Sequence, residues 1–225
     1  MTDMPRVLIF DVNETLLDLT PLKETVGAAL GGRGDLLPLW FTTMLQYSLV
    51  DSLIGQYRDF AQVGVGALMM IGEKQGISID RDTAEQAIIE PIRHLPAHPD
   101  VVPALESLRS NGFIMAALTN SSRSGVAAQL TNAGIIELFH HVVSTEEVQA
   151  FKPDPKPYRH ALDLLETDAT ETLMVAAHAW DLAGAKNVGL QTAFIARPGA
   201  VLYPNVERPD IVVSDLAGLV STITT

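Results

Sequence analysis

Six short runs of apolar residues recur along the chain, separated by longer segments in which apolar and polar residues mix. The runs are Val7–Phe10, Phe113–Leu118, His141–Val143, Leu173–Ala177, Thr192–Ala196 and Ile211–Val213. Short runs without strict alternation are typical of strands that are buried on both faces of a sheet. Because these runs alternate with helix-like segments, the pattern predicts an α/β fold with a parallel sheet and right-handed crossovers.

The interval between the first two runs is far longer than a strand–helix–strand crossover needs. Three segments within it show helical spacing of apolar residues, at Leu39–Ile54, Phe60–Ile71 and Thr83–Ile92. We therefore expect residues 20–95 to form a helical cap. The cap would be inserted into a Rossmann-like core made of residues 1–19 and 96–225.

Composition narrows the class of protein. Apolar residues make up 47% of the chain and charged residues 19%, which permits a large core and argues against disorder. The net charge of −12 argues against nucleic acid as a partner. Without cysteine, disulfides and thiolate metal sites are excluded. Met1–Pro5 lacks the pattern of a signal peptide, and no apolar run is long enough to span a membrane. We expect a cytoplasmic protein without membrane segments.

Polar residues that can carry chemistry follow the ends of the predicted strands. Asp11 follows the first run, Thr119 and Asn120 follow the second, Lys152 follows the third, and Asp181 follows the fourth. Each alone has an ordinary explanation, as a helix cap, a turn residue or a solvated side chain. Ligands in open α/β sheets bind beyond the carboxyl ends of the strands. The ordered set therefore predicts an active site at this edge of the sheet.

This set resembles the haloacid dehalogenase superfamily over nearly the whole chain, and most closely its L-2-haloacid dehalogenase family. The motifs that carry the resemblance are Asp11 to Thr15, Lys152 to Tyr158 and Ala177 to Asp181. The resemblance implies that Asp11 is a nucleophile supported by Thr15. It also implies that Lys152 and Asp181 set the charge of Asp11 and help to activate water, with Tyr158 as support.

The resemblance also implies a substrate. Asp11 would displace the C2 substituent of a small 2-substituted carboxylic acid, and water would then cleave the aspartyl ester without a metal or other cofactor. Thr119, where the family usually has serine, and Asn120 would hold the substrate carboxylate. Pocket-lining roles fall on Phe41, Leu45, Phe60 and Trp180, although all four could equally serve in core packing or in an interface. Relatives are often dimers through the cap, so a homodimer is expected.

Two departures from the superfamily's phosphatases argue against phosphoryl transfer. Asn13 stands where those enzymes have an acid that protonates the leaving alkoxide, and an amide cannot do this. Ala177 stands four residues before Asp181, where they use a further acid for Mg²⁺. We predict no metal site, and a Mg²⁺-dependent phosphatase is the weaker alternative.

Departures from the dehalogenases concern the leaving group. Phe41 aligns with the cap arginine that binds halide in the dehalogenases. If a loop is misaligned, Arg33 or Arg58 could take the place of that arginine. Asn13 replaces a common aromatic residue, and His178 replaces a common asparagine. Histidine can protonate a departing amine, although it could also simply pack or cap a helix. This combination resembles L-azetidine-2-carboxylate hydrolase.

Our principal functional prediction is therefore ring opening of L-azetidine-2-carboxylate to 2-hydroxy-4-aminobutyrate, with Asn13 and His178 acting on the leaving group. The first alternative is an L-2-haloacid dehalogenase with an altered halide site. A catalytically silent binding module is the alternative from another class of protein.

Overall fold

The computed structural model describes residues 4–224, so part of the Met1–Pro5 prediction lies outside the described residues. Within this range a six-stranded parallel sheet has the order β3-β2-β1-β4-β5-β6. The strands are β1 (Val7–Phe10), β2 (Ile114–Thr119), β3 (His141–Ser144), β4 (Thr172–Ala176), β5 (Gln191–Ile195) and β6 (Ile211–Val213). The α/β fold with a parallel sheet is confirmed, and each strand lies within one residue of the predicted run.

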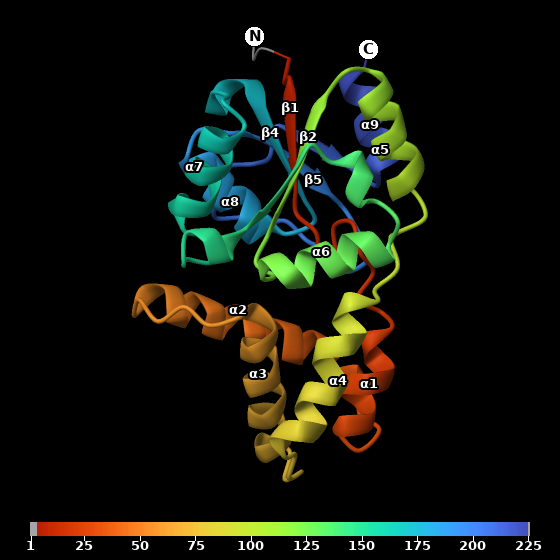
Figure 1. Cartoon of the computed structure of the whole chain (residues 1–225), viewed down its shortest axis with the longest axis vertical. Helices are drawn as coiled ribbons and strands as arrows, with labels where there is room; N and C mark the ends of the chain where they lie inside the picture. Colours follow the sequence, from red (N-terminus) through yellow and green to blue (C-terminus); the bar gives the residue numbers. More distant parts are fainter. Residues whose placement is uncertain (1–3, 225) are drawn as a thin grey trace.

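Helices lie on both faces of the sheet and also beyond its carboxyl edge (Figure 1). They are α1 (Leu22–Ala29), α2 (Leu37–Leu53), α3 (Phe60–Lys74), α4 (Arg81–Arg93), α5 (Val101–Ser110), α6 (Arg123–Asn132), α7 (Pro155–Leu164), α8 (Ala179–Asn187) and α9 (Leu216–Ile223). No helix in residues 4–224 is long and apolar enough to cross a membrane.

The helix bounds differ from the predicted ones where proline was taken as a boundary. The structure begins α2 at Leu37 rather than after Pro38, because proline fits the first turn of a helix, where no N–H bond is needed. Helix α4 contains Pro91, as the predicted segment Thr83–Ile92 does, and extends beyond that segment at both ends. The short helix α1 had not been singled out from the sequence.

Both faces of β1 are covered, as its continuous apolar run predicts. Val7 and Ile9 pack in one core cluster with residues of α7 and α8. Leu8 and Phe10 pack in the other, larger cluster with residues of α5, α6 and α9. Burial on both faces is typical of a central strand, and β1 lies between β2 and β4. The carboxyl end of β1 is directed toward the helices α1–α4 (Figure 1).

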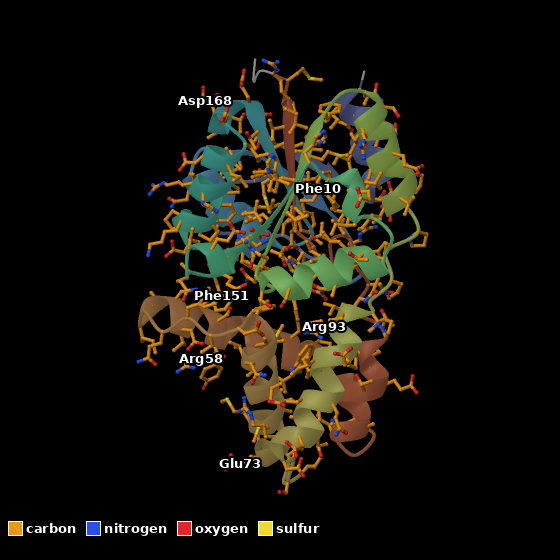
Figure 2. All side chains as sticks on the ribbon, viewed as in Figure 1. Phe10, Arg58, Glu73, Arg93, Phe151 and Asp168 are labelled. Carbon is orange, nitrogen blue, oxygen red and sulfur yellow. The ribbon has the colours of Figure 1, made fainter. Side chains whose placement is uncertain are left out.

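The helices α1–α4 pack against one another beyond the carboxyl ends of the strands. The indole N–H of Trp40 on α2 donates to the carbonyl of Gly64 on α3 at 2.8 Å. Phe151 from the core lies above α2 and packs against Phe60 and Tyr57, with ring centroids 5.5 and 4.7 Å away (Figure 2). Aromatic contacts therefore join these helices to the core next to the site.

Two connections join α1–α4 to the rest of the chain, and they pair with each other. A bridge links Leu17 in the first connection to Ala97 in the second. The N–H of His98 donates to the carbonyl of Leu16 at 2.9 Å, and a ring nitrogen of His98 lies 3.1 Å from the carbonyl oxygen of Glu14. The boundaries that we propose for the cap, residues 20 and 95, fall in these two connections.

Candidate active site

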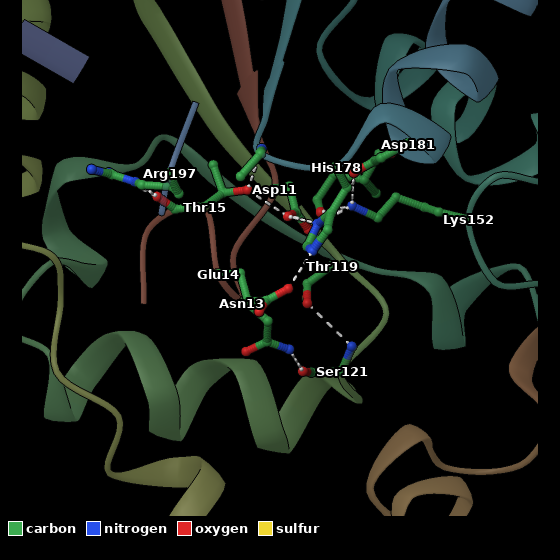
Figure 3. Close-up of polar contacts among 12 residues, drawn as sticks. Asp11, Asn13, Glu14, Thr15, Thr119, Ser121, Lys152, His178, Asp181 and Arg197 are labelled. Atoms are coloured by element: carbon green, nitrogen blue, oxygen red, sulfur yellow. Dashed lines mark hydrogen bonds and ion pairs between the residues drawn. The ribbon is translucent and has the colours of Figure 1, made fainter. Parts of the chain in front are cut away.

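Asp11 follows directly after β1, and its carboxylate is almost completely buried. The backbone N–H of Asp11 still bonds β4, at 3.0 Å from the carbonyl of Val175. The Nζ of Lys152 lies 2.9 Å from Oδ1 of Asp11. The hydroxyl of Thr15 and Nδ1 of His178 lie 2.6 and 3.0 Å from Oδ2 (Figure 3). Both carboxylate oxygens are therefore held by hydrogen-bonding groups.

These contacts determine the charge of Asp11. Burial alone would raise the pKa of Asp11, but the charges of Lys152 and His178 and the bond from Thr15 hold it far below its usual range. Asp11 is therefore an ionised carboxylate in a site that excludes most water. Fixed donors of the protein replace water around this carboxylate and orient it.

Lys152 joins Asp11 to a second buried carboxylate, Asp181. The side chains of Lys152 and Asp181 are 1% and 0% exposed, and Nζ lies 2.6 Å from Oδ2 of Asp181. The hydroxyl of Tyr158 donates to Oδ1 of Asp181 at 2.5 Å. Although burial lowers the pKa of Lys152, the two carboxylates outweigh it and raise that pKa. Lys152 is therefore a permanent cation between two acids.

Burial also acts on the partners of Lys152. It raises the pKa of Asp181, an effect that Lys152 opposes. Burial and the adjacent carboxylate of Asp181 raise the pKa of Tyr158 well above its usual value. Tyr158 therefore keeps its proton and acts as a donor to Asp181.

Glu14 is a site residue that the sequence analysis missed. Its backbone has φ of 61°, and its carboxylate lies 2.8 Å from Nε2 of His178 (Figure 3). His178 thus bridges Asp11 and Glu14 through its two ring nitrogens. Burial would lower the pKa of His178, but the bonds to Asp11 and Glu14 raise it to about 9. His178 is therefore an imidazolium near neutral pH.

Two aromatic rings hold the imidazole of His178. The ring of Phe41, from α2, lies 5.8 Å from the imidazole centroid, and that of Trp180, from α8, lies 5.1 Å away. Both are tilted by 28° from its plane, which is close to stacking. Phe41, which aligns with the cap arginine of the dehalogenases, thus packs against His178. The two arginines considered as replacements pair within their own segment, Arg33 with Asp35 and Arg58 with Asp51.

Thr119 and Asn120 lie at the end of β2 and are buried. The hydroxyl oxygen of Thr119 accepts a bond from the N–H of Ser121 at 3.1 Å. The carbonyl oxygen of the Asn120 side chain accepts the N–H of Lys152 at 2.9 Å, which ties the lysine loop to β2. The hydroxyl proton of Thr119 and the amide N–H groups of Asn120 are the donors that these residues could offer to a substrate carboxylate.

Asn13 makes contacts that differ from those expected of a leaving-group residue. Its amide nitrogen lies 3.4 Å from the hydroxyl of Ser121, and its amide oxygen accepts from Gln129 on α6 at 2.9 Å. The structure therefore directs the Asn13 amide toward Ser121 and α6 rather than toward His178 (Figure 3).

Comparisons with known proteins agree with this geometry. A family model for haloacid dehalogenase-like hydrolases matches residues 5–189. The chain belongs to the haloacid dehalogenase-like hydrolase family. The prediction that the protein is a hydrolase of this superfamily is thereby confirmed.

The relatives of this hydrolase cover almost its whole length. (S)-2-haloacid dehalogenase 2 from Pseudomonas sp. (strain CBS-3) is 33% identical over 94% of this chain and 92% of its own. (S)-2-haloacid dehalogenase from Pseudomonas sp. (strain YL) is 30% identical over 99% of this chain and 96% of its own. The solved structure of L-2-haloacid dehalogenase from Xanthobacter autotrophicus with chloropropionic acid covalently bound matches with a TM-score of 0.88. It is 27% identical and covers 98% of both chains.

The oxygen atoms in the site of this hydrolase are not arranged to bind Mg²⁺, which prefers several oxygen ligands in near-octahedral geometry. Both oxygens of Asp11 are bonded to cations, Lys152 and His178. Within residues 4–224, no group of three or more acids and histidines is placed to hold a metal ion. We assign no step of the reaction to a metal.

A cavity of about 690 Å³ adjoins the site of the hydrolase on the side of Glu14 and His178. Its walls also include Trp180, whereas Phe60 is buried against Phe151 and Leu45 is half-buried against the larger core cluster. Of the apolar residues predicted to line the pocket, Trp180 and Phe41 are thus brought to His178, and Phe60 serves mainly in packing.

Proposed function

We propose that this hydrolase acts on small 2-substituted carboxylic acids through an ester at Asp11. A carboxylate oxygen of Asp11 bonds to C2 of the substrate, and the C2 substituent leaves with the bonding electrons. Water then cleaves the ester at the carboxyl carbon of Asp11 and releases the 2-hydroxy acid. The observation that carries this proposal is the ionised, buried Asp11 held between Lys152 and His178.

Hydrolytic dehalogenation of 2-haloacids is the form of this reaction that the relatives support. Several of them, at about the same length as this chain, are named (S)-2-haloacid dehalogenases. These names favour the alternative stated from the sequence, dehalogenation, over ring opening of L-azetidine-2-carboxylate. The substrate carboxylate would bind the donors of Thr119 and Asn120 at the end of β2.

An amine as leaving group is kept as a second candidate because of two contacts. Phe41, which has no donor for a halide, occupies one side of His178. Glu14 adds a carboxylate at Nε2 of the ring, and this charge attracts an ammonium group and repels a halide ion. L-azetidine-2-carboxylate is the amine substrate to test.

The test is a turnover assay in the presence of EDTA with L-2-chloropropionate and L-azetidine-2-carboxylate, followed by mass spectrometry of the product. We expect chloride and lactate from the first substrate at a rate that EDTA does not change. Formation of 2-hydroxy-4-aminobutyrate without halide release would favour the second candidate. Activity that disappears with EDTA and appears with phosphate esters would contradict the proposal.

The same assay on Asp11→Asn tests the nucleophile. The amide lacks the negative charge that attacks C2, so turnover should fall by a factor on the order of 10⁴ or more. Asp163→Asn on the exposed face of α7 makes the same chemical change outside the site and should retain activity. Residual turnover by a folded Asp11→Asn protein near the wild-type rate would exclude Asp11 as the nucleophile.

Two further proposals concern the whole protein. The exposed apolar side chains near the end of α2, Leu53 and Ile54, would be buried in a homodimer formed through the cap. A cytoplasmic location is the second, and it stays a prediction from the sequence.

A further inference from the structure

The hydrolysis of an ester at Asp11 needs a base for the attacking water. Asp181 is poorly suited to this role in the structure. Its side chain is 0% exposed, and its two oxygens already accept bonds from Lys152 and Tyr158 at 2.6 and 2.5 Å. A water molecule would have to displace one of these donors to reach Asp181.

His178 has the position that a base needs. Its Nδ1 lies 3.0 Å from an oxygen of Asp11, next to the carbon that water must attack. Esterification removes the charge of Asp11 that holds this contact, so Nδ1 becomes free to bond a water, whereas the bonds of Lys152 and Tyr158 to Asp181 are unchanged. Its Nε2 faces Glu14, and the rings of Phe41 and Trp180 hold its plane. The imidazole is thus oriented at both nitrogens and at its ring.

The contact with Glu14 distinguishes His178 from a histidine that serves only in packing. Its side chain is 42% exposed and lines the cavity beside the site, whereas that of His178 is only 11% exposed. The row from Asp11 through His178 to Glu14 therefore connects the buried nucleophile to an accessible carboxylate. A carboxylate bonded to the far nitrogen of an imidazole fixes its tautomer and stabilises its cation.

We propose that His178 is the base that removes a proton from the water during ester hydrolysis, and that Glu14 is the residue that positions it. The inference rests on the proposed ester at Asp11. It applies to a halide and to an amine as leaving group, because both give the same type of ester.

The protons balance through one cycle. When the ester forms, the charge of Asp11 is lost, and His178 gives its Nδ1 proton to the departing amine or, for a halide, to a water molecule that exchanges with the adjoining cavity. Nε2 keeps its proton, which Glu14 holds. Nδ1 then takes one proton from water as the water oxygen bonds to the carboxyl carbon of Asp11. The bond from this carbon to the substrate oxygen breaks, and that oxygen takes the remaining water proton. Asp11 is again a carboxylate facing a protonated His178.

The charges around His178 support this exchange. With both carboxylates ionised, the pKa of His178 is about 9, and loss of the Asp11 charge on ester formation moves it downward. The charged or titratable groups that face the ring and its cavity are Asp11, Glu14, Asp18, Lys23, His98, Lys152, Asp181 and Arg197. Of these, Asp11 and Glu14 bond the ring itself.

The experiment measures the two steps separately. Rapid quenching of a single turnover with L-2-chloropropionate, and in parallel with L-azetidine-2-carboxylate, follows the ester by intact-protein mass. We compare the wild type with His178→Gln, Glu14→Gln and the control Glu106→Gln, which makes the same change on the exposed face of α5. Circular dichroism and thermal unfolding verify that each variant is folded.

With L-2-chloropropionate, whose leaving group needs no proton, we expect His178→Gln to accumulate the ester, with hydrolysis slowed about 100-fold or more. Glu14→Gln should slow hydrolysis between about 10- and 100-fold while ester formation changes much less. In Glu14→Gln the midpoint of the rise of the hydrolysis rate with pH should also move to lower pH, because the imidazole has lost a neighbouring anion. A merely structural role of Glu14 would not move this midpoint.

The possible failures are distinguishable. If the wild type forms an ester and the folded His178→Gln variant hydrolyses it at the wild-type rate, this inference is overturned and the proposed function stands. An unchanged pH midpoint in Glu14→Gln overturns the role of Glu14. If the wild type forms no ester with either substrate, the proposed function and this inference both fail.

Discussion

His178 and Lys152 are the two cations in a site that contains three carboxylates, those of Asp11, Asp181 and Glu14. Lys152 bonds two of these acids, and His178 bonds Asp11 and Glu14. Such a group is stable only because each charge has a partner, since an unpaired buried charge costs several kcal/mol. At the scale of single residues, catalysis and folding thus depend on the same pairs.

His178 gives a testable dependence of stability on pH. Its folded pKa of about 9 lies above the ordinary value of 6.5, so its contribution is complete below about pH 6.5 and is lost as the pH rises through 9. The difference corresponds to roughly 3 kcal/mol. Urea unfolding of wild type and His178→Gln at about pH 6 and pH 9.5 should show a gap that narrows at the higher pH. A gap independent of pH would contradict the ion pairs.

At the scale of elements, the central strands β1, β2 and β4 were predictable because each is an apolar run that is buried on both faces. The residues at their carboxyl ends, such as Asp11 and Asp181, could therefore be placed near one another from the sequence. Glu14 could not, because its contact with His178 depends on a left-handed backbone, with φ of 61°, that no spacing of residues indicates. The direction of the Asn13 amide depends on Gln129 of α6, a contact across more than a hundred residues.

Helix α8 approaches the lysine loop closely, and Gly184 makes this possible. A Cβ at this position would lie 2.6 Å from Cβ of Pro153 and 2.7 Å from the hydroxyl of Tyr158. Gly184→Ala should destabilise the protein by about 1–3 kcal/mol and slow ester formation, since Lys152 and Tyr158 must shift. Gly66→Ala on α3 meets nothing within 4 Å and should be neutral or stabilising by up to about 1 kcal/mol. Thermal unfolding that ranks the two variants equally would argue against this close approach.

At the scale of the whole molecule, α2 has one face toward the core and another toward solvent. Leu49 and Leu53 on its outer face, and Ile54 directly after it, are exposed, with Leu53 86% exposed. We expect the protein to be a homodimer in light scattering at micromolar concentration. Leu49→Asp combined with Leu53→Asp should give a monomer, because charges would be buried in the interface. Leu164→Asp on α7 is the control, and a monomeric wild type would contradict the proposal.

The pairing of the two connections between α1–α4, the cap that we propose, and the core ties the position of these helices to the chemistry. His98, in the second connection, bonds the carbonyl of Glu14, and Phe41 of α2 packs against His178. A swing of the cap about these connections would draw Phe41 away from the imidazole and would pull on Glu14 through His98. Enclosing the substrate and assembling the base would then be a single event, so that an open enzyme could admit substrate but could not complete a turnover.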